Sequence, residues 1–251
     1  MTPARRFCLP LLASAIVAVQ PSIAAQSPTS PPTVPLSDGE FRALVAPAIA
    51  AAQADDCPRV FAVIDPALSR LAGRNRNAAQ LLRLPCLIAA ARSDEAQIVY
   101  REVVESDPRS PLIRSVGVIV ALSAGDYVEA GTRLASLAED DPAALTRLTG
   151  TAVRGITQAL TETREFKVRD RLFIALARSD WQPQDRPEMR DGFAVGAIDA
   201  LVGTPRASEA DALLPRITAP EMLAGMAIER HYEPLWPAIE SRMGPHTAFA
   251  V

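Results

Sequence analysis

AAARSDEA, at residues 89–96, and SAGDYVEA, at residues 123–130, are the two stretches of this chain that decide its fold. They superimpose, and the same offset that places Ala96 on Ala130 places Pro108 on Pro142. A period of about 34 residues, which this offset matches, is typical of helix–turn–helix repeats. Small residues such as Ala let two helices approach closely, while Gly and Pro define turns. The two stretches therefore predict similar helical hairpins, and the alternative is an ordinary helical bundle with a chance spacing.

Part of this pattern resembles a known repeat family. Residues 125–130, GDYVEA, resemble the inter-helix turn and the small second-helix residue of tetratricopeptide repeats, and Pro108 and Pro142 stand where that family ends its second helix. The resemblance covers about residues 77–142 and is degenerate elsewhere. It implies an all-α fold built as a right-handed stack of antiparallel helical hairpins. In that family the face made by the first helix of each hairpin often grips peptides.

The first helix of each copy departs from the family pattern. Leu84 and Val118 replace the family's small residue, and Leu87 and Ala121 replace its aromatic residue. A further step of the same length finds neither the Ala nor the Pro at the matching positions. We therefore expect the later hairpins to be degenerate copies or a related helical solenoid.

Helical patterns continue along the rest of the chain. Apolar residues recur at spacings of three and four, and the strict alternation that suits strands is nearly absent. The one competing stretch, VGVIV at residues 116–120, is β-rich by propensity, but it lies in a longer apolar run that suits a buried helix better. Helices are expected at residues 38–54, 58–72, 76–91, 94–106, 111–124, 126–139, 142–161, 165–179, 186–202, 206–216, 219–230 and 233–243.

The first 25 residues have the three parts of a secretory signal. Arg5 and Arg6 precede a short apolar stretch at residues 9–19, and small residues follow near position 25. The apolar stretch is about half of what a bilayer requires. A buried N-terminal helix is the alternative. Removing residues 1–25 changes the formal net charge from −3 to −5, because two arginines and no acid are lost. We expect a periplasmic or secreted protein with no nucleic-acid partner and no stable membrane insertion.

The remainder divides into a linker, a domain and a tail. Residues 26–36 carry four prolines among Ser and Thr, a composition that stays extended. The helical repeat domain is expected at residues 37–243. The tail, residues 244–251, begins like a new helix and then stops, so it is expected either to be cut short or to pack against a second subunit. The pattern of a capping box, in which two side chains satisfy free helical N–H groups, occurs at residues 37–40, 185–188 and 218–221.

The mature chain keeps two cysteines, Cys57 and Cys86. An even pair in an exported protein favours a disulfide. An antiparallel pair of helices at residues 58–72 and 76–91 would bring the two cysteines near each other, with some tilt. The alternative is two buried, inert thiols.

No catalytic constellation stands out in the sequence. The two histidines, His231 and His246, are too far apart to share one helical turn, and no Cys/His spacing suits zinc. A nucleophile elbow and a phosphate loop are both missing. The one candidate acid/base cluster is Glu229, His231 and Glu233, in which His231 also suits a helix C-terminus as a cation. We expect no metal, no cofactor and no enzymatic activity.

The expected role is that of a protein–protein interaction scaffold or adaptor in the bacterial cell envelope, with self-association left open. The alternative is an enzyme or small-ligand carrier that uses a pocket between hairpins near His231. The predicted partner surface is apolar, and either a partner docks on it or neighbouring helices bury it. Trp181 and Trp236 are candidate anchors, or else packing wedges. The other predicted partner-binding residues are Leu81, Leu82, Ile88, Leu112, Val116 and Ile119.

Overall fold

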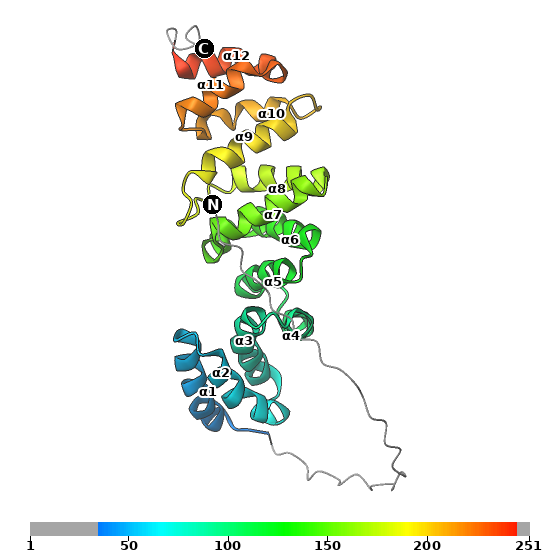
Figure 1. Cartoon of the computed structure of the whole chain (residues 1–251), viewed down its shortest axis with the longest axis vertical. Coiled ribbons are helices and arrows are strands. Elements are labelled where there is room, and N and C mark those ends of the chain that lie inside the picture. The colour runs from blue at the N-terminus through cyan, green and yellow to red at the C-terminus, as the bar shows by residue number, and fades with distance from the viewer. Residues whose placement is uncertain (1–34, 245–251) are drawn as a thin grey trace, which may run out of the picture. The chain divides into compact units, whose positions relative to one another are not determined.

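The computed structural model describes residues 35–244, and within this range every regular element is a helix (Figure 1). This part of the chain is therefore all-α, as predicted. The expected signal segment, all but the last two linker residues and all but the first residue of the tail lie outside the described residues. The stretch at residues 116–120 is helical, because it forms the middle of a helix that is covered on two sides.

The longer helices follow the predicted periodicity closely. For α1, α4, α5, α6 and α8 both ends lie within one residue of the predicted bounds. The α-helices are α1 (Asp38–Gln53), α2 (Cys57–Ile64), α3 (Gly73–Ala89), α4 (Ser93–Ser106), α5 (Pro111–Ser123), α6 (Tyr127–Asp140), α7 (Gly150–Glu162), α8 (Phe166–Arg178), α9 (Met189–Leu201), α10 (Ser208–Asp211), α11 (Pro220–Ile228) and α12 (Trp236–Met243).

Four predicted helices were wrong in their extent, because short 3₁₀ turns interrupt or replace part of them. Each of these turns contains a proline, which lacks the N–H that a continuing α-helix needs and clashes with the preceding turn. The helix expected at residues 58–72 stops at Ile64, and the one expected at 142–161 begins only at Gly150. The 3₁₀ turns are η1 (Asp65–Arg70), η2 (Pro142–Arg147), η3 (Leu214–Arg216) and η4 (Arg230–Leu235).

The same turn geometry ends the first helix of four successive hairpins. One residue in each turn adopts a left-handed conformation, and the N–H of the next residue donates to a carbonyl five positions earlier. This is the hydrogen-bond pattern of a Schellman cap. The left-handed residues, with their φ values, are Asp55 (55°), Ala91 (55°), Gly125 (74°) and Arg164 (62°).

The same turn geometry also occurs at Arg164, where the sequence shows no third copy of the repeated pattern. Ala91 and Gly125 keep the offset of the sequence repeat, whereas the step from Gly125 to Arg164 is longer. The segment η2 lies between them and lengthens the connection between α6 and α7. A fixed step along the sequence consequently misses the turn at Arg164.

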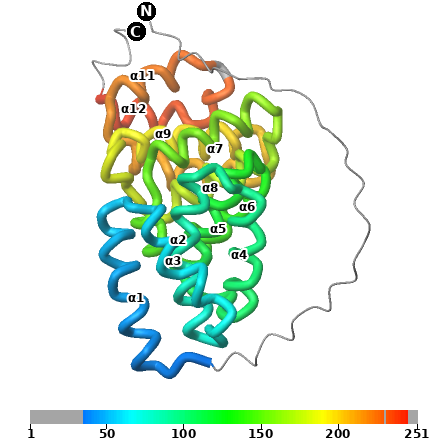
Figure 2. Tube along the Cα trace, turned by 60° about the horizontal axis from the view of Figure 1, so that its bottom comes forward, coloured from blue at the N-terminus to red at the C-terminus, as the bar shows by residue number. Residues whose placement is uncertain are grey.

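Helices pack mainly against helices that are one or two places away along the chain. The pairs α1·α2, α1·α3 and α2·α3 show this at one end of the series, and Figure 2 shows these three helices side by side. Further along, α3·α4, α4·α5, α5·α6, α6·α8 and α8·α9 continue it.

Successive hydrophobic cores share helices, which explains why some helices are apolar on nearly all sides. Helix α5 sends Ile113 and Val120 into a core with α3 and α4, and it sends Val118 and Ala121 into the core of the later helices. Its apolar composition follows from this double burial.

Cys57 and Cys86 form a disulfide that joins the start of α2 to α3, with a Cα–Cα distance of 5.2 Å. The predicted pairing is confirmed. Within the described range, no helix has the length and hydropathy needed to cross a bilayer.

The structure confirms the predicted capping box at one helix and contradicts it at two others. Ser37 and Glu40 form the expected reciprocal capping box at α1. The box expected at residues 185–188 is wrong, because Asp185 instead accepts hydrogen bonds from the N–H groups of Gly150 and Thr151, at 2.6 and 3.0 Å, and so caps α7. The box expected at residues 218–221 is also wrong. There, Asp191, which is 6% exposed, takes the capping role and accepts from the N–H groups that precede α11.

Candidate functional site

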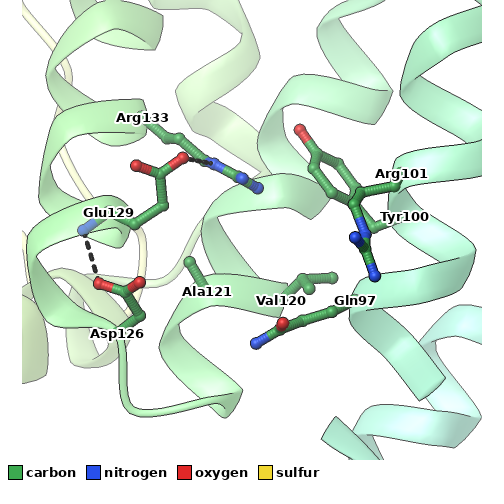
Figure 3. Close-up of a pocket in the computed structure, with 8 residues that line it drawn as sticks. All are labelled: Gln97, Tyr100, Arg101, Val120, Ala121, Asp126, Glu129 and Arg133. Atoms are coloured by element: carbon green, nitrogen blue, oxygen red, sulfur yellow. Dashed lines mark hydrogen bonds and ion pairs between the residues drawn. The ribbon is translucent and has the colours of Figure 1, made fainter. Parts of the chain in front are cut away.

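A hollow of about 220 Å³ lies where α4, α5 and the start of α6 meet. It is built at the junction of the two hairpins whose sequences repeat. Figure 3 shows the side chains from α4 and α6 on opposite sides, with small apolar residues of α5 between them. The lining residues are Gln97, Tyr100, Arg101, Val120, Ala121, Asp126, Glu129 and Arg133.

The α6 side of this hollow is fixed by a chain of local contacts. Asp126 caps α6 by accepting from the N–H of Glu129, at 3.0 Å. One turn later, Arg133 donates from Nε to the Glu129 carboxylate at 2.7 Å, the i,i+4 arrangement that stabilises helices. Arg133 also donates to the carbonyl of Gly117 at 3.0 Å, which ties α6 to α5. The guanidinium is therefore held in place by contacts within the chain.

Tyr100 forms the inner wall of the hollow. The Arg133 guanidinium carbon lies 4.6 Å from the centre of the Tyr100 ring, a cation–π contact. Burial raises the pKa of the Tyr100 phenol, and the positive charge of Arg133 opposes this only in part. The phenol consequently stays neutral at physiological pH.

The α4 side of the hollow has two polar side chains without a partner among the described residues. Gln97 and Arg101 lie one turn apart on α4 and are exposed. Neither has a hydrogen-bond or ion-pair partner within residues 35–244, whereas Arg133 and Glu129 across the hollow are paired with each other. Because an amide both donates and accepts and a guanidinium only donates, this side suits peptide carbonyls and carboxylates.

The structure uses most of the predicted apolar face for its own packing. Leu81, Ile88 and Val116 pack against the core that α3, α4 and α5 share. Leu82 packs against the core of the first three helices, and Ile119 against that of the later ones. Leu112 differs, since it is 45% exposed. The apolar signal along α3 and α5 thus reflects the spaces between hairpins more than an open groove.

The two tryptophans also lie on internal surfaces. Trp181 is 7% exposed and stacks on Phe193, with ring centres 6.0 Å apart. Trp236 is half-buried against the core of the later helices. Both act as packing wedges in this arrangement, and the hollow at α4–α6 contains neither.

The predicted acid/base cluster of Glu229, His231 and Glu233 does not form, and His231 has a different partner. His231 does not pair with Glu229 or Glu233; its Nε2 lies 2.8 Å from Oδ1 of Asp199 on α9, and the Tyr232 hydroxyl donates to the same oxygen at 3.2 Å. Burial, reinforced by the Asp199 charge, raises the pKa of Tyr232 strongly. Sequence reasoning missed Asp199 because it lies far from His231 along the chain. A hollow of about 340 Å³, lined in part by Met222 and Tyr232, adjoins this cluster.

The sequence alone does not show that Gln97, Tyr100 and Arg133 line one hollow. Tyr100 and Arg133 meet only when α4 and α6 flank α5, and Gln97 carries no local signal. The one local signal is the i,i+4 pairing of Glu129 with Arg133. Among the described residues, no group of His, Cys, Asp and Glu side chains is arranged to hold a metal ion.

No family model, curated protein or solved structure matches the chain.

Proposed function

We propose that this chain is a non-enzymatic scaffold or adaptor that binds other proteins in the bacterial cell envelope. The observation that carries the proposal is the hairpin turn repeated at Asp55, Ala91, Gly125 and Arg164. Similar hairpins that each contact their neighbours present long surfaces suited to peptide binding. In this proposal the protein acts through shape and charge, without a covalent step.

We interpret the repeated hairpins as a right-handed, tetratricopeptide-like stack. Two features support this interpretation. The turns at Ala91 and Gly125 keep the repeat period of that family, and helices pack mainly with neighbours one or two places along the chain. The longer spacing to Arg164 fits a stack whose later units have diverged.

The binding surface in this proposal is the junction between α4 and α6. Its α4 side has the free donors of Gln97 and Arg101, and its α6 side has the preorganised pair of Glu129 and Arg133. A peptide that crosses this junction would meet hydrogen-bonding groups on both sides. Because Arg133 is already held by three contacts, little side-chain entropy is lost when a ligand binds there.

Export to the envelope is part of the proposal. It is supported by the signal-like residues 1–25 and by the disulfide between Cys57 and Cys86, since structural disulfides persist in oxidising compartments. Fractionation of cells, with N-terminal sequencing of the recovered chain, tests it. A chain that stays in the cytosol with Met1 in place would contradict it.

Site-specific photo-crosslinking tests the binding surface. A photoreactive amino acid is placed at Gln97 or, as a matched control, at the exposed Ser69 of η1. Each full-length variant is irradiated in an envelope extract of the organism that encodes the chain. We expect one discrete protein adduct from position 97 that is lost when Arg101 is changed to Glu. The same adducts from both positions, or none from either, would contradict the proposal.

A second candidate function is the binding or conversion of a small ligand near His231. The hydrogen bond between His231 and Asp199, beside a hollow of about 340 Å³, favours it. A thermal-shift screen of envelope metabolites against the purified chain tests it. A compound that stabilises the unmodified chain should not stabilise His231→Ala, and it should still stabilise the control variant Glu233→Gln. This candidate function is contradicted if no compound stabilises the chain, or if His231→Ala responds like the unmodified chain.

A further inference from the structure

A second, larger groove lies along α8. It has a volume of about 520 Å³ and is bordered by the end of α6, by α8, and by the end of α9 with the loop that follows it. Four of its lining residues on α8 are spaced like a single stripe of a helix, at i, i+4, i+7 and i+11. These are Lys167, Arg171, Ile174 and Arg178.

Positive charge on the rim of this groove exceeds the negative charge that pairs with it. Arg171 is matched, because its guanidinium forms a fork with the Glu139 carboxylate, at 3.0 and 2.6 Å. Arg178 and Arg206, however, share one carboxylate, that of Glu209. One of these two cations is therefore left in excess, in a chain whose formal net charge is −3.

Lys167 supplies a second unmatched charge. It is the one lysine of the chain, it is exposed, and it has no ion-pair partner in the part of the chain that the structure describes. The nearby carboxylate of Asp170 is bound by Arg169, at 2.7 Å. Lys167 and Arg178 stand at the two ends of the α8 stripe, which places them roughly 16 Å apart along the helix.

The floor between these charges is apolar. Ile174, from the middle of the α8 stripe, is half-buried there, and Leu201 and Pro205 lie on the α9 side. An occupant that matches the groove must therefore carry negative charge at two separated points and an apolar side chain between them.

We propose that the α8 groove binds a segment of a partner protein in which acidic residues flank a central apolar side chain. Its carboxylates pair with Lys167 and with the Arg178–Arg206 end, and its apolar side chain covers Ile174. This inference rests on the proposed scaffold function and names the chemistry of one partner. The groove is distinct from the α4–α6 junction, since the two share no lining residue.

Fluorescence anisotropy with three labelled twelve-residue peptides tests the assignment on the full-length chain. The first peptide alternates Glu with Leu, the second has Lys in place of Glu, and the third has Ser in place of Leu. We expect the first to bind, with an affinity that falls at least tenfold between about 50 and about 300 mM salt. The second should not bind, and the third should bind at least tenfold more weakly. Equal binding of the first and third peptides, or no binding of the first, overturns the proposal.

Variants locate the binding. Lys167→Glu should lower the affinity for the first peptide at least fivefold. Lys167→Arg should retain the affinity, because the positive charge is kept. Arg154→Glu, on the exposed side of α7, is the matched control for the same charge reversal and should leave binding unchanged. If Lys167→Glu melts below the unmodified chain, Lys167→Gln replaces it with the same expected direction. Unchanged binding in the Lys167 variants, or equal loss in Arg154→Glu, overturns the proposal.

Two outcomes separate this inference from the function on which it rests. In the first, vesicles that contain anionic lipid displace the first peptide completely. This result would mean that the groove binds a membrane surface and not a protein segment, and it would overturn the proposal. An adduct from position 97 without any binding of the acidic peptide would overturn the α8 assignment alone, and the scaffold function would stand.

Discussion

The ring of Tyr100 on α4 lies directly over Gly117 on α5, in the space that the Cβ of any larger residue would occupy. The carbonyl of the same glycine accepts a hydrogen bond from Arg133, whose guanidinium lies over the Tyr100 ring. The approach of α4 to α5, and with it the shape of the α4–α6 hollow, thus depends on the absence of one side chain.

Gly117→Ala should lower the free energy of unfolding by about 2 kcal/mol, because the new methyl group forces the Tyr100 ring from its place. Chemical denaturation measures it. Gly155→Ala is the matched control: it lies in α7 with open space around it, so it should raise stability by about 0.5–1 kcal/mol. The cost of Gly117→Ala should shrink in a Tyr100→Leu background. A cost that stays the same in that background would show that the ring is not responsible.

Ala91→Gly should stabilise the chain by about 1 kcal/mol, because a left-handed conformation costs a residue with a Cβ about 1–2 kcal/mol. The φ of Ala91 is 55°. Gly125→Ala, at the equivalent turn, should lower the free energy of unfolding by a similar amount. No atom crowds the position of the new Cβ, so the effect comes from the backbone conformation alone. Ala90→Gly, next in the chain but with a φ of −82°, is the control and should bring no gain. Chemical denaturation compares the three variants, and equal gains at residues 90 and 91 would contradict the interpretation.

Removal of the disulfide should cost about 3–4 kcal/mol, because closing a loop of this length restricts the unfolded chain by about that amount. Cys57 and Cys86 are separated by 29 positions. The measurement is guanidinium denaturation of a chain that comprises residues 26–251, with and without a reductant. The double variant Cys57→Ala/Cys86→Ala is the control, because a reductant should not change it. A reductant that leaves the unmodified chain equally stable would contradict the prediction.

Asp185 should make stability depend on pH in the acid range. Hydrogen bonds from the N–H groups of Gly150 and Thr151 lower the pKa of Asp185 below its usual 3.8. A group with a lowered folded pKa stabilises the fold at pH values above its unfolded pKa, and this stabilisation is lost as the pH falls through the folded pKa. Asp185→Asn should therefore be less stable than the unmodified chain at neutral pH, and the two should converge at pH values below the folded pKa. Denaturation midpoints from acid to neutral pH measure this.

The control for that prediction is Asp107→Asn, which changes an exposed carboxylate in the loop after α4. Its pH profile should run parallel to that of the unmodified chain. If Asp185→Asn also runs parallel to the unmodified chain, the carboxylate does not cap α7 in solution.

Local sequence determined the features that depend on neighbouring residues. Helical periodicity set the bounds of α4, α5, α6 and α8, and the reciprocal cap of Ser37 and Glu40 lies within one turn. The repeated spacing identified two hairpins, because Ala, Gly and Pro constrain a turn by themselves. The breaks at the 3₁₀ turns were missed although their prolines are local, since proline is also accepted in the first turn of an α-helix.

Only the tertiary structure decided which distant residues share a surface. Asp185 caps α7 from the loop between α8 and α9, His231 meets Asp199 rather than its neighbouring glutamates, and Tyr100 meets Arg133 across α5. These pairings depend on how the helices are packed, and the spacing between turns does not stay constant along the chain. Periodicity fixes which side of a helix is apolar, but it leaves open whether that side meets another helix of the same chain or a partner. In α3 and α5 the apolar sides meet the chain's own helices, because each of these helices serves two adjacent cores.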